Sequence, residues 1–316
     1  MKTNLIYILG MMCLSGTVSA QTTVNYTEFE QKVLDYSQTL KQSVSQRTAM
    51  QKAMKAAKTA FFPAVDATGS YQYRINKYDM DFGGMAVPME HDSYSAEVGV
   101  VQPIYAGGSI YHTYKASQIQ SQIADKSVDL TTDNLIYAAE ASYWGTAAQK
   151  EMYKTMCQYV EIISQLTKVL QDKYDDGYIS KTDLIQMQTR LKEAELQRSS
   201  SYQSYQIALQ NMNVLMGLEP DKEVGLVDSI FVELPLPAYV GADAALNVRP
   251  DYAISQLDVD YQKRQVKLAA AKYNPSLSIG FKETWGTQML NISGETMFNS
   301  NVYASVKLPL FHWGAR

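Results

Sequence analysis

The sequence predicts a mixed α and β membrane protein, in which a long coiled-coil α-helical hairpin is combined with four transmembrane β-strands per protomer. Three observations lead to this prediction. A stretch of 116 residues, from Ile104 to Glu219, contains no proline. Four short segments alternate between apolar and polar residues, and motifs of the first half recur in the same order in the second half.

The proline-free stretch predicts two very long helices, because a proline inside a helix costs about 3 kcal/mol. Its apolar residues recur at spacings of three and four, as in the seam of a coiled coil. The expected seam residues are Ile119, Ile123, Met152, Met156, Val160, Ile163, Leu166 and Leu170 on the first helix, and Leu184, Met187 and Leu191 on the second. The polar break DDGYIS at 175–180 predicts a tight turn with Gly177 in a left-handed conformation. Helices over 109–174 and 181–216 would then form a hairpin.

Four segments outside this hairpin alternate with a period of two, which predicts β-strands with one apolar face. They cover residues 64–76, 94–101, 276–285 and 302–308, and only Glu283 interrupts an apolar face. The polar faces carry full charges and the apolar faces end in Tyr or Trp, as in strands that cross a membrane. Four strands cannot close a barrel, and lipid does not tolerate open sheet edges, so we expect the chain to oligomerise.

Each pair of strands is preceded by a helical segment, over 26–60 and 250–272. Aligning the two halves brings Pro63 onto Pro275, an offset of 212, and Pro103 onto Pro309, an offset of 206. The difference falls in the loop between the strands. This pattern indicates an internal duplication.

The first 20 residues predict a signal peptide, with Lys2 before an apolar run and a small-residue ending at Ala20. Cleavage there would leave Cys157 as the one cysteine, so no internal disulfide is expected. The net charge is −4, and no cluster of Lys and Arg suggests a nucleic-acid partner. The three histidines, His91, His112 and His312, have no metal-like spacing, and no catalytic motif is recognisable, so we expect neither an enzyme nor a cofactor.

From about Tyr26 to Arg316, the chain resembles an outer-membrane efflux protein of the TolC type, in the outer membrane factor family. The motifs that carry this resemblance are the alanine-rich helix into Phe62-Pro63, QPIYAGGS at 102–109, DGYISKTDL at 176–184, NVLMGL at 213–218, RPDY at 249–252 and LPLFHWGAR at 308–316. No one motif is specific, but their order and spacing are. The resemblance implies a trimeric 12-stranded β-barrel, continued by an α-helical tunnel through the periplasm of a Gram-negative bacterium.

With this resemblance, the chain divides into eight expected segments. They are the signal peptide (1–20), a periplasmic N-terminal helix (21–61), the first transmembrane β-hairpin (62–104), the long periplasmic coiled-coil hairpin with its tip near 175–182 (105–217), an equatorial connector (218–248), the helix of the second repeat (249–273), the second transmembrane β-hairpin (274–311) and the start of a second coiled-coil hairpin (312–316). Because the chain ends where the second coiled-coil hairpin would begin, we expect a C-terminally truncated form that lacks half of the tunnel wall.

The resemblance also assigns roles to individual residues. At the hairpin tip, an adaptor-binding segment would comprise Gly177, Tyr178, Ile179 and Thr182. The strand-to-helix corners would be formed by Pro103, Gly107, Gly108, Pro309 and Gly314, with the two prolines ending the strand ladders. The lumen-facing charges would be Arg74, Glu97, Lys282 and Lys307. Repeated by symmetry, Asp172, Asp175 and Asp176 would form an acidic ring at the tunnel mouth, and the alternative is that they are the solvated end of a helix.

The implied function is that of an outer-membrane channel, a passive exit duct for small molecules. Its partners would be a periplasmic adaptor protein, an inner-membrane pump, two further copies of the chain and outer-membrane lipid. The alternative is a periplasmic structural coiled-coil protein without channel activity, whose strands pack as a soluble sandwich. A narrower alternative is copper(I) handling by the loop 77–91, which holds Met80, Met85, Met89 and His91.

Overall fold

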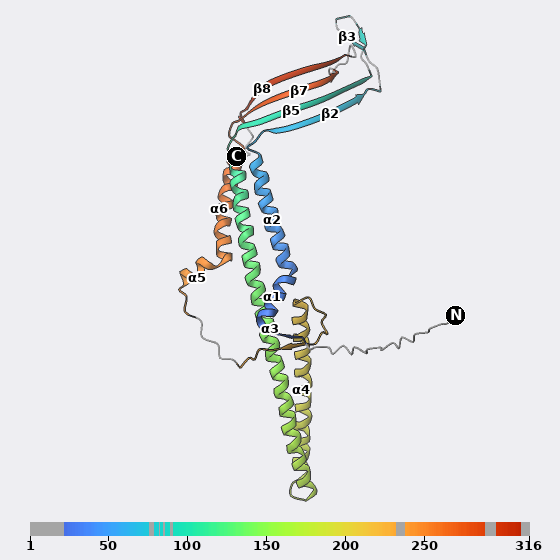
Figure 1. Ribbon diagram of the computed structural model, residues 1–316, viewed down its shortest axis with the longest axis vertical. Coiled ribbons are helices and arrows are strands. Elements are labelled where there is room, and N and C mark those ends of the chain that lie inside the picture. The colour runs from blue at the N-terminus through green and yellow to red at the C-terminus, as the bar shows by residue number, and fades with distance from the viewer. Residues whose placement is uncertain are drawn as a thin grey trace, which may run out of the picture. The chain divides into compact units, whose positions relative to one another are not determined.

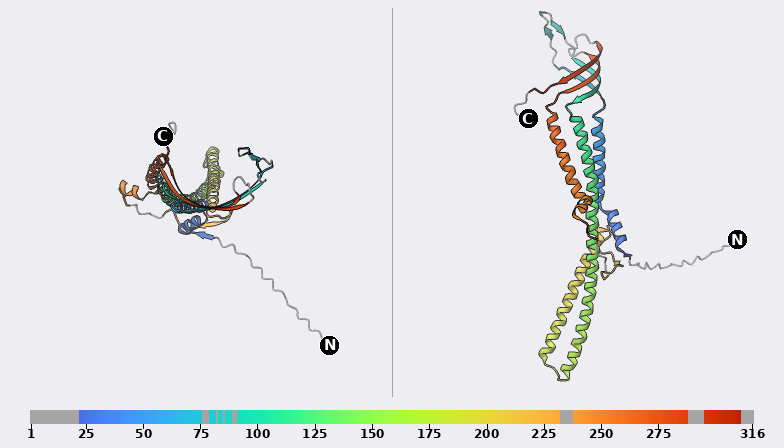
Figure 2. Two further views of the ribbon diagram at one scale, coloured as in Figure 1. Left: turned by 90° about the horizontal axis from the view of Figure 1, so that it is seen from above. Right: turned by 90° about the vertical axis from the view of Figure 1, so that its left-hand side faces the viewer.

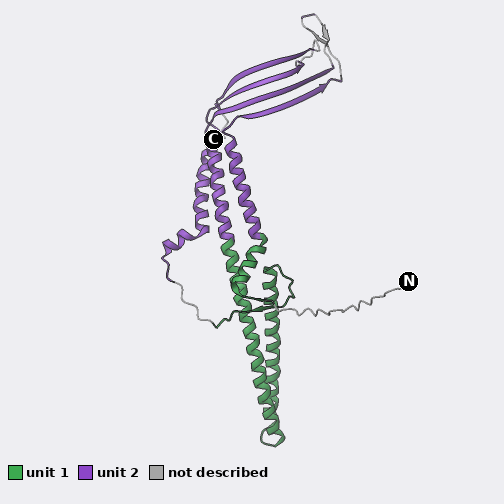
Figure 3. Ribbon diagram, viewed as in Figure 1, with its two compact units in different colours: residues 1–38, 132–237 green, residues 39–131, 238–316 purple. Residues whose placement is uncertain are grey.

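The computed structural model describes residues 22–75, 79–81, 83–84, 86–88, 91–231, 238–287 and 295–310. The expected signal peptide, Gly314 and the side chains of the three loop methionines lie outside the described residues. The chain divides into two compact units (Figure 3), one formed by Met1–Gln38 and Thr132–Pro237 and the other by Thr39–Thr131 and Ala238–Arg316. We call them unit 1 and unit 2.

The chain is a mixture of long helices and a sheet (Figure 1). Its elements are β1 (Thr22–Val24), α1 (Tyr26–Tyr36), α2 (Gln38–Thr59), β2 (Ala64–Tyr73), β3 (Asp79–Asp81), β4 (Ala86–Pro88), β5 (Asp92–Ala106), α3 (Ser109–Asp175), α4 (Lys181–Leu215), β6 (Val224–Leu226), α5 (Ala242–Val248), α6 (Pro250–Ala271), β7 (Ser276–Thr287) and β8 (Thr296–Lys307). None of the helices in the described part of the chain is both long enough and apolar enough to cross a membrane.

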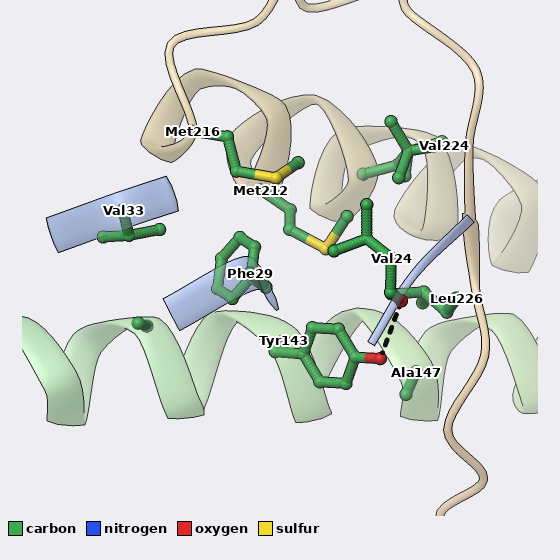
Figure 4. Close-up of a cluster of buried hydrophobic side chains, with 11 residues drawn as sticks. Val24, Phe29, Val33, Tyr143, Ala147, Met212, Met216, Val224 and Leu226 are labelled. Atoms are coloured by element: carbon green, nitrogen blue, oxygen red, sulfur yellow. Dashed lines mark hydrogen bonds between the residues drawn. The ribbon is translucent and has the colours of Figure 1, made fainter. Parts of the chain in front are cut away.

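Unit 1 is built around a small apolar core where α1, α3 and α4 meet a two-stranded parallel sheet (Figure 4). The sheet pairs β1 with β6, with Val24 opposite Leu226. The buried residues are Val24, Phe29, Val33, Ala139, Tyr143, Ala147, Leu209, Met212, Met216, Val224 and Leu226. Neither short strand was predicted from the sequence.

One polar network lies at the edge of this core and joins three distant segments. The hydroxyl oxygen of Tyr143 lies 2.7 Å from the Asp228 carboxylate and 3.1 Å from the carbonyl oxygen of Val24 (Figure 4 draws the second contact). The backbone N–H of Tyr26 donates to the same Asp228 oxygen, at 2.7 Å. Burial raises the pKa of the Tyr143 hydroxyl, and its bond to Asp228 raises it further. Burial also raises the pKa of Tyr26 to about 12.

In unit 1, α3 and α4 are the two arms of a helical hairpin. Val160, Leu184 and Ala194 are buried along its seam. Two predicted seam residues were wrong, since Met152 is 52% exposed and Leu166 is 43% exposed. A helix of 3.6 residues per turn drifts relative to a strict heptad, so positions chosen by spacing alone leave the seam over several turns.

The N-terminal helix predicted over 26–60 is two helices, α1 and α2, separated at Ser37. α1 starts at Asn25, whose side chain accepts a hydrogen bond from the Glu28 N–H at 2.8 Å. At its end, the ring of Tyr36 lies where a Cβ atom on Gly217 would be, at 2.4 Å. This close packing inside unit 1 fixes the end of α1, and the sequence pattern around Ser37 gives no sign of it.

Unit 2 contains a four-stranded antiparallel sheet in the order β2-β5-β7-β8, which is curved (Figure 2). Here β5, β7 and β8 extend beyond the predicted strands, and β2 ends earlier, at Tyr73. β2 and β8 are the edge strands, so within the described residues each pairs on one side only. A small β3–β4 hairpin and the helix α5 were not predicted. The first part of α3 lies between α2 and α6 (Figures 1 and 2).

Replacing Tyr143 with Phe should lower the free energy of unfolding of unit 1 by about 1–2 kcal/mol, because Asp228 then loses a charge-assisted partner. The measurement is urea denaturation of the detergent-solubilised chain, followed by far-UV circular dichroism. The control is Tyr159→Phe on the same helix, where the side chain is 42% exposed. Equal effects of the two substitutions would contradict the role of the network.

The stability of unit 1 should also fall in alkali. An unfolded chain loses the tyrosine proton near pH 10, whereas the raised pKa of Tyr143 keeps the folded chain protonated at that pH. The stabilisation is therefore complete below about pH 10 and is lost as the pH rises towards the folded pKa. Between about pH 10 and pH 12, we expect the free energy of unfolding to decrease more steeply in the parent chain than in Tyr143→Phe, and parallel curves would refute this.

Candidate functional site

The register of the sheet in unit 2 assigns every strand residue to one of two faces. On one face Val100 lies opposite Phe281, and Phe281 lies opposite Val302. The same face carries Val65, Ala67, Tyr71, Tyr73, Val98, Ile279, Leu277, Ala304 and Val306. We call it the apolar face and the opposite one the polar face.

The polar face carries three of the four predicted lumen-facing charges. Glu97 and Lys282 form an ion pair of 2.6 Å between β5 and β7. Lys307 lies on the same face by alternation from Asn301, which pairs with Lys282. Arg74 follows the end of β2, where its backbone N–H donates to the carbonyl oxygen of His91 at 2.6 Å. A hollow of about 860 Å³ on this face includes Ser70, Gln72, Ser95, Glu97, Lys282, Thr284 and Asn299.

Two of the residues that depart from the alternation have a partner on the neighbouring strand. Glu283 lies on the apolar face, and its carboxylate accepts a hydrogen bond from the Ser300 hydroxyl at 2.5 Å. Tyr303 lies on the polar face and covers Gly280, whose Cβ would come within 2.3 Å of the ring. Ser300 thus gives Glu283 a hydrogen-bond partner on the next strand, and Gly280 leaves room for the ring of Tyr303.

Aromatic residues cross the apolar face near the loop end of the sheet. Tyr71 is opposite Tyr94 in the register. The ring of Tyr94 is 5.6 Å from Trp285, which is 6.5 Å from Phe298. This row therefore runs across all four strands. At the other end of β5, Tyr105 lies opposite Leu277 and is half exposed.

The first corner does not end the strand where Pro103 was expected to end it. β5 continues past Pro103 to Ala106, with a bulge at Ile104. Pro103 tolerates this position because β2 begins opposite Val101, which leaves β5 paired on one side only. The amide of Gln102 donates to the carbonyl oxygen of Pro103 at 2.8 Å.

Two glycines with positive φ then turn the strand into α3, namely Gly107 (φ 63°) and Gly108 (φ 86°). A Cβ on Gly107 would lie 2.5 Å from the carbonyl oxygen of Ala271. The side-chain amide of Asn274 donates to the carbonyl oxygen of Gly107 at 2.9 Å. The corner is thus packed against the end of α6. Pro309 is described after β8, but the proposed role of Gly314 cannot be compared, since it is outside the described residues.

The hairpin tip in unit 1 is a compact turn between α3 and α4. Gly177 has φ 80°. The backbone N–H of Tyr178 donates to the carbonyl oxygen of Lys173 at 2.8 Å, and the N–H of Gly177 donates to the carbonyl oxygen of Tyr174 at 2.9 Å. This is the Schellman pattern of a helix end. α4 then starts with a capping box, in which Ser180 and Asp183 satisfy each other's backbone N–H groups.

The predicted tip residues are mainly exposed. Tyr178 is 79% exposed, Thr182 is exposed and Ile179 is half-buried. A Cβ atom added to Gly177 would have no other atom within 4 Å, so the space beside this glycine is open. Asp172, Asp175 and Asp176 are also exposed. Within the described residues no three His, Cys, Asp or Glu side chains gather where they could hold a metal ion.

No curated protein matches the chain in sequence. Among solved structures, the chain is similar to CusC, a protein that changes conformation on folding and transmembrane channel formation. The identity is 13%, the TM-score is 0.76, and the coverage is 92% of this chain and 66% of CusC. It is similar to the Campylobacter jejuni CmeC outer membrane channel, with 16% identity, a TM-score of 0.74 and coverage of 92% and 62%. It is also similar to the outer membrane protein VceC of Vibrio cholerae, with 14% identity, a TM-score of 0.73 and coverage of 92% and 69%.

These likenesses show a shared fold, and the chain spans about two thirds of the length of each of these proteins. A match of sequence to a family model goes further. The model described as outer membrane efflux protein matches residues 30–218, which is more than half of the chain. The chain therefore belongs to the outer membrane efflux protein family.

Proposed function

We propose that the chain is the outer-membrane channel component of a tripartite efflux or secretion system, and that it acts as a passive exit duct for small molecules. The observation that carries this proposal is the two-faced sheet of unit 2. Its apolar face would contact outer-membrane lipid, and its polar face, with Glu97, Lys282 and Lys307, would line the lumen.

The spacing of the aromatic residues supports a membrane position. Tyr94 and Tyr105 lie on the apolar face 11 residues apart. At about 3.3 Å per residue this is about 36 Å along the strand. At a tilt of about 40° it becomes about 28 Å, close to the apolar band of about 25 Å in outer-membrane barrels.

The edges of the sheet support a trimer. β2 and β8 each leave one side unpaired in the described chain, and lipid does not tolerate unpaired strand edges. In the proposed assembly, β8 of one copy pairs with β2 of the next, and three copies give a closed barrel of 12 strands. The helices would continue as a tunnel in the periplasm of a Gram-negative bacterium.

The hairpin tip is the proposed docking site for a periplasmic adaptor protein, which would connect the channel to an inner-membrane pump. Gly177 permits close backbone approach, and the exposed Tyr178 and Thr182 offer ring and hydroxyl contacts. The acids Asp172, Asp175 and Asp176 would then lie at the tunnel mouth.

Cysteine labelling tests the two faces of the wall. In a Cys157→Ser background, Asn301→Cys and Val302→Cys place adjacent thiols on the polar and the apolar face of β8. In intact outer membranes, a water-soluble maleimide should modify the Asn301 variant at least about tenfold faster, because lipid covers the neighbouring position. Both thiols should react equally in denaturant. Equal rates in native membranes would reject the membrane wall and favour a periplasmic coiled-coil protein.

A photocrosslinking amino acid at Thr182 tests the tip. Light should join the chain to the adaptor in living cells, and Gly177→Trp should remove this product, since a large side chain fills the free space and strains a positive φ. The control is Gly177→Asn, because Asn tolerates a positive φ and should keep most of the product. A strong product in Gly177→Trp cells would disprove the tip assignment.

A further inference from the structure

The segments that join the helices to the strands contain no acidic residue. Residues 36–65, 98–124 and 261–282 hold no Asp or Glu, although the chain has 32 of them. An even distribution would place about eight in these 79 of 316 residues. The same segments carry 11 Lys and Arg. Unit 2 therefore has a strongly basic zone where α2, α3 and α6 meet the sheet.

Two hollows near this zone lie on opposite sides of α3 and α6. The first, about 560 Å³, includes Ser109, Lys272, Ser276 and Lys307, so it opens on the polar-face side of the sheet. The second, about 630 Å³, includes Gln118 and Lys263. Gln118 follows Ser109 by nine residues and Lys263 precedes Lys272 by nine, which on a helix of 100° per residue is half a revolution, about 180°. The second hollow therefore lies on the side of the apolar face.

The second hollow is a basic groove between α3 and α6. It is lined by Lys115, Lys263, Arg264 and Lys267, with Asp260 as its one acidic group. Asp260 forms an ion pair with Lys263, at 2.8 Å. In the described part of the chain no carboxylate pairs with Lys115, Arg264 or Lys267. Burial and then repulsion from Lys267 and Arg264 lower the pKa of His112 beside the groove, which agrees with a positive local potential.

α2 adds two lysines on the same side. The side chain of Gln51 reaches Asp125 of α3, at 3.4 Å. Asp125 follows Gln118 by two helical turns, so this contact lies on the groove side of α3. Lys55 and Lys58 are one and two turns beyond Gln51, and both are exposed.

We infer that these six residues form a basic collar that binds the anionic headgroups of phospholipids in the membrane leaflet next to the helices. The collar consists of Lys55, Lys58, Lys115, Lys263, Arg264 and Lys267. This inference rests on the proposed function, because the apolar face must be in lipid for the collar to reach a headgroup.

Depth and charge both favour this occupant. At 1.5 Å per residue, each collar residue lies within about 12 Å of the strand-side end of its helix. The headgroup layer is about 5–8 Å thick, and charges act over a further Debye length of about 8 Å. Tyr105 and Tyr111 are half exposed beside the collar, and Tyr111 lies two turns before Gln118. Tyrosine next to Lys and Arg is the usual composition of a membrane interface.

The test uses the full mature chain in detergent, with phosphatidylglycerol or phosphatidylethanolamine added at equal concentration and bound lipid counted by native mass spectrometry. The test variant carries Lys55→Gln, Lys58→Gln, Lys115→Gln and Lys267→Gln. The parent chain should prefer phosphatidylglycerol. Since each removed lysine weakens such binding roughly fivefold, the variant should lose at least about tenfold of this preference.

The matched control removes four positive charges far along the hairpin, by Lys154→Gln, Lys168→Gln, Lys173→Gln and Lys192→Gln, and should keep the preference. Raising the salt concentration on the parent chain should abolish it without any substitution, and millimolar inorganic phosphate should not. Displacement by such phosphate, an undiminished preference in the test variant, or no preference in the parent chain would each overturn the inference. The maleimide labelling of β8 separates the two proposals, because a chain with sided labelling and no lipid preference refutes the collar alone.

Discussion

The register of the four-stranded sheet is the constraint on which the proposed function depends. Because side chains alternate along a strand, a slip of one residue would exchange the apolar and polar faces completely. The structure fixes the register at three depths. At the loop end, Gly286 (φ 149°) lies so close to Tyr94 that a Cβ would be 2.2 Å from its carbonyl oxygen, and the Thr287 hydroxyl bonds to both backbone groups of Tyr94. The Glu97–Lys282 ion pair holds the middle, and the contact of Gly107 with Asn274 holds the helix end.

The main elements of the fold could be predicted because they depend on local periodicity. A period of two is visible in β2 and β7, and a long proline-free repeat of three and four is visible in α3 and α4. What could not be predicted depends on contacts between distant segments. β1 and β6 have only three residues each and exist through their pairing across about 200 residues of chain, and the break at Ser37 follows from the packing of Tyr36 on Gly217.

The candidate sites follow the same division. The turn at Gly177 was predictable because a left-handed residue commonly ends a helix, and glycine is the residue that usually adopts this conformation. The path of β5 through Pro103 was not predictable, since it depends on where β2 begins beside β5 and on the bulge at Ile104 in the pairing of β5 with β7. Glu283 was visible in the sequence as an exception, but its Ser300 partner is known only from the register.

In the described part of unit 2, one lysine of the sheet has a carboxylate partner whereas most collar residues have none, and this difference has a physical explanation. Lys282 lies within the sheet and has Glu97 as an internal partner, so its charge is compensated by the chain itself. Five of the six collar residues have no carboxylate partner among the described residues. Only Lys263 has one there, since it pairs with Asp260. Unpaired charges of one sign repel one another and so lower the stability of the folded chain. An anionic surface outside the chain removes this cost, and it also explains why the acid-free segments occur where the helices meet the strands.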